Sequence, residues 1–375
     1  MKILFINDYK NWGWAEVIWN LTYKLFDNSN ILYLEDLIWK NKLFKLFNML
    51  FFNIFLYFKL KKVIKEFKPD IIHLHNYNLS PITVLLAIKN YKSVQTVHAS
   101  WQICPSSWGV YRKNYKKCNL KPWFKKCMTN CFFDKPKIPW IIYYFWHRFV
   151  VKLRKKYTKW FIFPSQALKK WFEINWFKNL VVISNPIVFD IKKESNVKKE
   201  NIILYVWKII KLKWVDILVE SLLKTDIDNY KFIFVWDWPL LNKLKEKTKN
   251  DNRFNFLWKV SHDEVINYHL KSKIVVVPSI WFDNYPTSII EWLLTDNIII
   301  WFDRWWIKEL LWENLTINID SWNYIDKLNK KINEIVENYN KYKEISLERK
   351  EMILKNNFVE KYKEKLEKFY SLILK

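Results

Sequence analysis

The chain has 375 residues, enough for about two domains, and 51% of them are hydrophobic, enough to fill two cores. Its formal net charge of +26 suits an anionic partner such as nucleic acid or a membrane surface. The excess is nearly all lysine, in a chain also rich in Asn, Ile, Phe and Tyr, as AT-rich codons would produce, so we expect no nucleic-acid partner.

The amino terminus, KILFIN, is typical of a strand and not of a signal peptide. No apolar run reaches the roughly 18 residues of a membrane-spanning helix. These two features predict a cytoplasmic protein.

Strand-like runs alternate with helical patterns along the whole chain. This alternation predicts an α/β protein with doubly wound parallel sheets. A polar stretch, 190–200, follows Asn185-Pro186 and divides the chain into a domain of residues 1–189 and a domain of residues 190–356, with a last helix, about 357–375, that joins the first domain. The expected strands are 2–6, 31–34, 71–74, 94–97, 161–163 and 181–183 in the first domain, and 202–206, 232–235, 254–257, 274–277 and 298–300 in the second.

Glycine and tryptophan occur in unusual numbers. There are 2 Gly and 24 Trp, whereas a chain of this length normally has about 26 Gly, which equals the two counts together. We hypothesise that most of these Trp mark UGA codons that the source translates as glycine; the alternative is a genuinely Trp-rich protein.

The positions of the tryptophans favour the recoding hypothesis. Trp236 and Trp238 flank Asp237 where a strand ends, at a turn that requires the conformational freedom of glycine. Tryptophan has no such role at a strand-to-helix turn. Further tryptophans near such turns are Trp12, Trp14, Trp207 and Trp214. We also take Trp292, Trp301, Trp305 and Trp306 as glycine.

Five short motifs acquire a common meaning once these Trp are taken as Gly, apart from Trp281, which we expect to be a genuine Trp. They lie at residues 11–16 (NWGWAE), 205–218 (YVWKIIKLKWVDIL), 234–240 (FVWDWPL), 278–291 (PSIWFDNYPTSIIE) and 302–309 (FDRWWIKE). Together, and in this order, they resemble the retaining glycosyltransferase family with the GT-B fold, glycosyl transferases group 1. The resemblance covers nearly the whole chain and implies two Rossmann-like domains that face each other across a cleft.

The resemblance assigns roles to four charged residues. Lys208 and Lys213 would neutralise the diphosphate of a nucleotide-sugar donor, although the family usually has Arg at the first position. Glu291 would accept hydrogen bonds from the ribose hydroxyls. Asp283 stands where most members have a sugar-contacting Glu; the alternative is a carboxylate that caps the loop.

Two further segments would approach the donor. The loop around Gly13 and Trp14 would direct backbone N–H groups at the phosphates, and the turn at Trp305 and Trp306 would lie close to the nucleotide-sugar. Glu309 would face the donor, or would be an ordinary charge at a helix amino terminus.

Histidines follow two of the expected strands. His98 resembles the family histidine beside the donor sugar; the alternative is a structural histidine. His73 and His75 alternate on one strand and share a face. We expect His75 near the cleft and His73 in a structural position.

The resemblance implies transfer of a hexose from a UDP- or GDP-sugar to a glycan or lipid-linked acceptor, with retention of configuration and no cofactor required for catalysis. Such a reaction would belong to the synthesis of cell-surface polysaccharide. Alternatives are a nucleotide-sugar epimerase or phosphorylase, or a non-catalytic binding protein with the same fold.

All four cysteines, Cys104, Cys118, Cys127 and Cys131, fall in one basic insertion. Four thiols could hold a structural zinc ion. Because the spacings lack a CxxC pair, reduced cytosolic thiols are the other interpretation.

Two segments of the first domain combine apolar residues with a basic tail. Residues 43–58 are followed by a run of lysines, and residues 138–156 have a similar composition. Both match a helix that lies on an anionic membrane, or else a core helix. We expect peripheral association with the inner face of the membrane.

Overall fold

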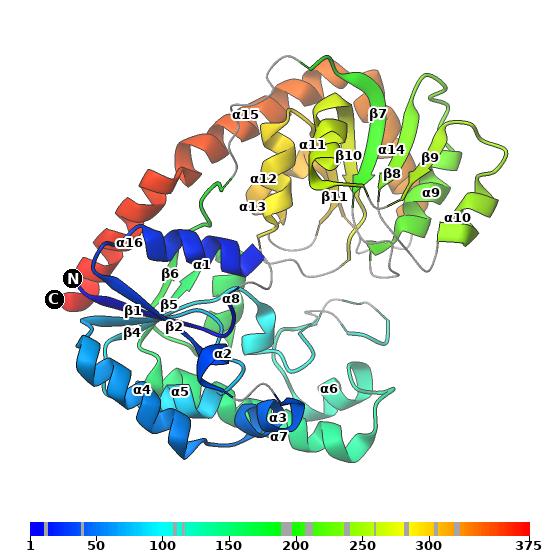
Figure 1. Cartoon of the computed structure of the whole chain (residues 1–375). Helices are drawn as coiled ribbons and strands as arrows, with labels where there is room; N and C mark the ends of the chain where they lie inside the picture. Colours follow the sequence, from blue (N-terminus) through cyan, green and yellow to red (C-terminus); the bar gives the residue numbers. More distant parts are fainter. Residues whose placement is uncertain are drawn as a thin grey trace. The chain divides into compact units, whose positions relative to one another are not determined.

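The computed structural model describes the chain except residues 11–13, 39–40, 108–110, 115, 117, 189–196, 207–212, 236–240, 259, 281–284, 304–306 and 319–322, and describes only the backbone at 14–16, 42 and 262. The chain forms two compact units (Figure 1). Unit 1 comprises Met1–Val188 and Phe358–Lys375, and unit 2 comprises Phe189–Asn357.

Unit 1 contains a parallel sheet of six strands in the order β2-β1-β3-β4-β5-β6. The strands are β1 (Ile3–Asn7), β2 (Ser29–Tyr33), β3 (Ile71–Leu74), β4 (Ser93–Thr96), β5 (Trp160–Phe163) and β6 (Leu180–Val182). The helices are α1 (Trp14–Lys24), α2 (Leu34–Leu37), α3 (Lys42–Leu50), α4 (Ile54–Phe67), α5 (Pro81–Ala87), η1 (Ser100–Gln102), α6 (Phe124–Asn130), α7 (Lys137–Tyr157), α8 (Gln166–Ile174) and α16 (Val359–Leu374).

Both faces of this sheet are covered, which explains its continuous apolar strands. Successive side chains of β1 enter opposite cores: Leu4 and Ile6 pack on the face covered by α4 and α5, whereas Ile3 and Phe5 pack on the face that includes α16. The carboxyl-terminal helix is therefore part of the core of unit 1.

Unit 2 contains a second parallel sheet in the order β12-β11-β10-β7-β8-β9. Its strands are β7 (Glu200–Val206), β8 (Lys231–Val235), β9 (Phe254–Leu257), β10 (Ser272–Val277), β11 (Ile298–Phe302) and β12 (Thr316–Ile317). Its helices are α9 (Val215–Leu223), α10 (Leu241–Lys247), α11 (His262–Lys271), α12 (Thr287–Leu294), α13 (Ile307–Leu310), η4 (Glu313–Leu315), α14 (Tyr324–Glu337) and α15 (Tyr339–Asn357). The sequence patterns did not predict β12 or α15.

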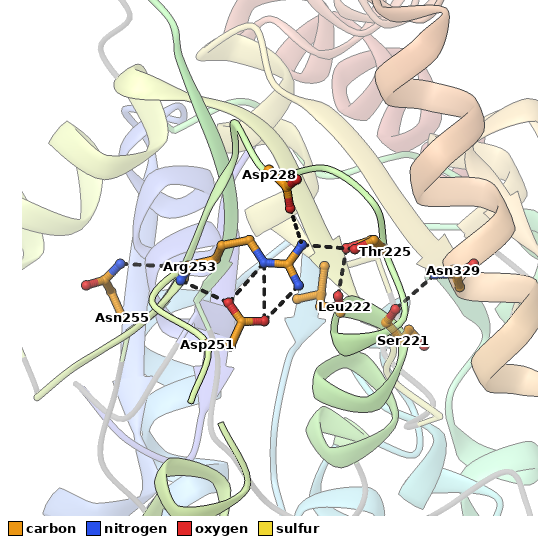
Figure 2. Close-up of polar contacts among 8 residues, drawn as sticks. All are labelled: Ser221, Leu222, Thr225, Asp228, Asp251, Arg253, Asn255 and Asn329. Carbon is orange, nitrogen blue, oxygen red and sulfur yellow. Dashed lines mark hydrogen bonds and ion pairs between the residues drawn. The ribbon is translucent and has the colours of Figure 1, made fainter. Parts of the chain in front are cut away.

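Arg253 connects the segment after α9 to the start of β9 in unit 2 (Figure 2). Its guanidinium donates three hydrogen bonds to the Asp251 carboxylate, with Nε–Oδ1 at 3.0 Å, Nε–Oδ2 at 3.2 Å and Nη2–Oδ2 at 2.7 Å, and one to the Thr225 carbonyl at 2.9 Å. The carbonyl of Thr225 follows α9, and Arg253 precedes β9. This planar group therefore ties a helix end to an edge strand at the amino-terminal edge of the sheet, away from the loops considered below.

The apolar segment 43–58 is not one helix. It is divided between α3 and α4, because the side chain of Asn53 accepts a hydrogen bond from the Leu56 N–H and caps a new helix. In the described part of the chain no single helix is long and apolar enough to cross a membrane; residues 43–50 and α4, bent by 71°, meet the test only as a pair.

Candidate active site

The strand order of unit 2 defines where a ligand can bind. Counted from β7, the order is that of the doubly wound nucleotide-binding sheet, whose ligand lies beyond the carboxyl ends of the strands where the order reverses. In this sheet the reversal falls between β7 and β10, which are adjacent. The loops after β7, β10 and β11 therefore begin at the same edge of the sheet.

Lys213 lies at this reversal. Its side chain is buried, with 4% of the residue exposed, and its Nζ donates a hydrogen bond of 3.0 Å to the Ser279 hydroxyl. Lys213 follows β7 and Ser279 follows β10. An ammonium group is thus held at the carboxyl ends of the two strands between which an anionic ligand would bind.

Glu291 is a second charged group of this unit, placed on the second turn of α12, the helix that follows β10. Burial raises the pKa of Glu291 to about 7. Its Oε1 is buried and has no hydrogen-bond partner among the described residues. A buried carboxylate oxygen without a donor is costly unless a ligand supplies one.

Several expected site residues lie outside the described residues: Gly13, Lys208, Asp283, Trp305 and Trp306. Others can be placed in part. The backbone of Trp14 begins α1, and Glu309 is half-buried on α13, a short helix after β11.

Trp214, Trp292 and Trp301, which are expected to be glycine, lie among the described residues of unit 2. Trp214 has φ 41° and ψ 39°, a left-handed conformation at the start of α9. Trp292 and Trp301 are buried with ring centroids 6.0 Å apart, and the indole of Trp292 donates to His269 Nε2 at 3.0 Å. In this structure those two rings are part of the core of unit 2.

Unit 1 brings its histidines together. His75 follows β3 and His98 follows β4, the neighbouring strand, and the Nδ1 of His75 lies 2.8 Å from the Nε2 of His98. Burial lowers the pKa of His98 to about 4 and that of His75 well below 6.5, so both rings are neutral. The Nε2 of His75 is buried without a partner among the described residues.

His73 has a different environment. Its ring bridges the Tyr370 hydroxyl, 2.5 Å from Nδ1, and the Thr96 hydroxyl, 2.7 Å from Nε2. Burial lowers its pKa to about 3. His73 therefore links β3 and β4 to α16, in the interior of unit 1.

The sequence analysis missed Asp8, which lies after β1 at the corresponding reversal of unit 1. Its carboxylate accepts hydrogen bonds from the backbone N–H groups of Asn78 at 2.6 Å and Leu79 at 3.0 Å. Asp8 fixes the loop after His75. Its position directly after the first strand was the available signal.

Two family models match the chain. Glycosyl transferases group 1 matches residues 188–352, and Glycosyltransferase Family 4 matches residues 40–191. No sequence among the curated proteins matches significantly.

Solved structures share the fold over the whole chain. HepE from Anabaena, in complex with UDP, has 16% identity and a TM-score of 0.71, covering 99% of this chain and 100% of that one. A glycosyltransferase from Rickettsia africae has 18% identity and a TM-score of 0.68, covering 100% and 98%. Sucrose-phosphate synthase from Thermosynechococcus elongatus has 13% identity and a TM-score of 0.68, covering 99% and 98%.

The chain is a glycosyltransferase of the GT-B type. The two parallel sheets are those expected from the sequence motifs. In this glycosyltransferase, Lys213 and Glu291 occupy the unit matched by the group 1 model, and His75 and His98 occupy the unit matched largely by the Family 4 model.

Proposed function

We propose that this glycosyltransferase moves a hexose from a UDP- or GDP-sugar to a glycan or lipid-linked acceptor, with retention of anomeric configuration. The observation that carries the proposal is the buried ammonium of Lys213 at the reversal point of the unit 2 sheet. Two HepE structures that share the fold contain UDP-glucose, or UDP and glucose. Another similar structure is a lipopolysaccharide outer core galactosyltransferase.

Each proposed role follows from the chemistry of the side chain. Lys213 and Lys208 stabilise the negative charge that grows on the diphosphate as the sugar leaves. Glu291 accepts hydrogen bonds from the ribose diol, which supplies the donors that its buried oxygen lacks. Asp283 and His98 contact the transferred sugar.

The remaining predicted contacts position the donor. The loop around Gly13 and Trp14 and the turn at Trp305 and Trp306 approach the phosphates and sugar through backbone groups. Glu309 faces the donor from α13. The resemblance to retaining enzymes supports attack by the acceptor on the face that the diphosphate leaves, with the leaving phosphate taking the acceptor proton.

A donor panel tests this function. UDP-glucose, UDP-galactose, UDP-N-acetylglucosamine and GDP-mannose are incubated with the protein, and NDP release and product anomer are followed by NMR. We expect Lys213→Ala to lower turnover at least a hundredfold, since it removes a transition-state charge contact, whereas Lys243→Ala on exposed α10 leaves turnover unchanged. Binding of a nucleotide-sugar without turnover would favour a non-catalytic protein, and inverted product would refute retention.

We propose that the acceptor is reached at an anionic membrane. The exposed residues Ile138, Ile142, Phe145 and Phe149 recur at intervals of four, three and four along α7, and so form one apolar face. α7 lies beside α3 (Figure 1), where the Trp146 indole donates a hydrogen bond of 2.9 Å to the carbonyl of Leu50.

The neighbouring surface has the same character. Exposed apolar side chains continue over α3 and α4, and both α4 and α7 carry basic residues in their last turns. These apolar residues include Leu43, Leu46, Phe47, Phe51, Ile54, Phe55 and Phe58. An apolar face bordered by lysines fits the inner, anionic leaflet of a membrane.

Vesicle flotation tests this surface. We expect flotation with vesicles that contain phosphatidylserine at low salt, and weaker flotation at high salt because the lysine contribution is screened. Ile142→Glu with Phe55→Glu should reduce binding at least tenfold, whereas Leu372→Glu, an equally exposed leucine on α16, should not. No flotation at low salt would refute the proposal.

We also propose that most tryptophans of this chain stand at UGA codons that the source translates as glycine. Trp176, which follows α8, supports this proposal because its φ is 63°. Its N–H donates a hydrogen bond to the Glu173 carbonyl, and the N–H of Phe177 donates to the Phe172 carbonyl. That pair of bonds defines a helix end whose left-handed residue is usually glycine. Reading the codons decides the matter, because UGG at 236, 238, 305 and 306 would refute it.

A further inference from the structure

The four cysteines of the chain converge on one small cavity. The cavity has a volume of about 10 Å³ and is lined by Cys104, Cys118, Cys127 and Cys131, with apolar side chains that include Leu120 and Trp171. None of the four cysteines forms a disulfide. A space of this size holds a single small occupant.

Three separate pieces of backbone bring the thiols together. Cys104 follows η1, where its N–H bonds the Ser100 carbonyl at 2.9 Å, and Cys127 and Cys131 lie one turn apart on and just after α6. Cys118 lies two residues before Leu120, whose carbonyl accepts a hydrogen bond of 2.7 Å from the Trp171 indole on α8. The walls of the cavity are therefore attached to the domain core.

The insertion has little else to hold it. Between η1 and α6 the described residues form no helix or strand, and the local apolar cluster is small, with Cys127, Cys131, Phe132 and Tyr144 as its buried members. Two of those four members are themselves cysteines. A long insertion with so small a core needs a cross-link to stay folded.

The charge around the cavity suits an anionic centre. Residues 111–137 contain nine Lys or Arg and a single acidic residue, Asp134. Arg112 donates a hydrogen bond of 2.9 Å to the Cys131 carbonyl. A divalent ion with four thiolates carries a net charge of −2, which these cations offset.

We propose that Cys104, Cys118, Cys127 and Cys131 bind one structural Zn²⁺ ion in tetrahedral geometry. As placed, neither these four cysteines nor any other group of three or more Cys, His, Asp or Glu among the described residues could hold a metal ion, so binding requires the four sulfur atoms to move closer together. Four S–H bonds break, four Zn–S bonds form at about 2.3 Å, and four protons pass to solvent with no change of oxidation state.

Metal binding at this place would order the loop behind His98. The Cys104 N–H donates a hydrogen bond to the Ser100 carbonyl, and the carbonyl of Trp101 lies 2.7 Å from His147 Nε2. The zinc site thus fixes the chain that follows β4. It does not rest on the proposed sugar transfer, because its ligands and its test are independent of any donor.

Metal analysis of the purified full-length protein tests the site. We expect one equivalent of zinc per chain by mass spectrometry, released in step with the modification of four thiols by a mercurial reagent. Cobalt substitution should give the thiolate-to-metal charge-transfer band of a tetrahedral sulfur site. Cys118→Ser should lower zinc content at least fivefold, whereas Thr129→Ala, at an exposed position of α6 between two of the cysteines, should leave it unchanged.

Three outcomes would overturn the proposal. They are zinc below a tenth of an equivalent after growth with added zinc, four thiols freely reactive in the folded protein, or a mass lower by two or four hydrogens that indicates disulfides. The thiol and metal measurements on the unmodified protein decide the question even if the cysteine variants fail to fold.

Discussion

Substitution of Glu291 by glutamine separates folding from function at the candidate site. The carboxyl group of Glu291 is buried, and burial raises its pKa to about 7 from an ordinary value of 4.5. The folded protein therefore holds a proton on Glu291 at pH values where the unfolded chain has lost it. Glutamine resembles the protonated acid in size and polarity but does not titrate.

The sign and size of the effect follow from this shift. Between pH 4.5 and 7 the folded state binds more protons than the unfolded state, so Glu291 lowers the free energy of unfolding as pH rises. A pKa shift from 4.5 to about 7 corresponds to a loss of about 3 kcal/mol in the free energy of unfolding. At pH 8, above both pKa values, the whole of this loss is present. Glu291→Gln should then be about 3 kcal/mol more stable than the parent at pH 8 and equal to it at pH 4.5.

Glu291→Gln should weaken nucleotide binding, although it raises the stability of the protein. A charged carboxylate forms stronger hydrogen bonds to ribose hydroxyls than an amide does, by about 1.5–3 kcal/mol. Glu291→Gln should weaken UDP binding about tenfold to a hundredfold at pH 8, and the parent's affinity should rise with pH through 7.

Urea unfolding and titration calorimetry with UDP, each at pH 5 and pH 8, measure both effects. Because the two proteins share all other titrating groups, the contributions of those groups cancel when the unfolding free energy of one protein is subtracted from that of the other. Equal stability at pH 8 would refute the burial argument. Equal UDP affinity would refute the ribose role.

Three further predictions concern residues outside this site. In the Glu291→Gln background the free energy of unfolding measured with urea should fall by at least about 2 kcal/mol between pH 7 and 5, which is the share of His73 alone, because its pKa is about 3 when folded and 6.5 when unfolded. The other buried histidines, whose pKa values burial also lowers, add to this fall, and a flat profile would contradict the prediction. Trp176→Gly should raise stability by about 1 kcal/mol by relieving a left-handed backbone, whereas Trp171→Gly should lower it by about 3–5 kcal/mol because that ring is buried; thermal unfolding of both checks the contrast. Arg253→Lys keeps the charge but loses the planar hydrogen bonds of Figure 2, and should cost about 1–2 kcal/mol in urea unfolding, against no loss if the charge alone mattered.

The pattern of apolar and polar residues along the chain was sufficient to predict most of the strands. Eleven expected strands appear in the two sheets with small shifts at their ends, since strands buried on both faces are short continuous apolar runs. The pattern failed where apolar content was not interrupted: residues 43–58 form parts of two helices, because one polar side chain, Asn53, caps the second.

Sequence by itself therefore determined the alternation of strands and helices, the family motifs, and the residue types at the loops that follow the strands. Tertiary structure decided which of those loops are neighbours. Lys213 meets Ser279, and His75 meets His98, only because β7 pairs with β10 and β3 pairs with β4. The same holds for the cysteines, whose spacing is irregular and whose shared cavity forms through packing of the insertion against α8. Distances across strand pairings depend on the order of the sheet, which the spacing of residues along the chain does not encode.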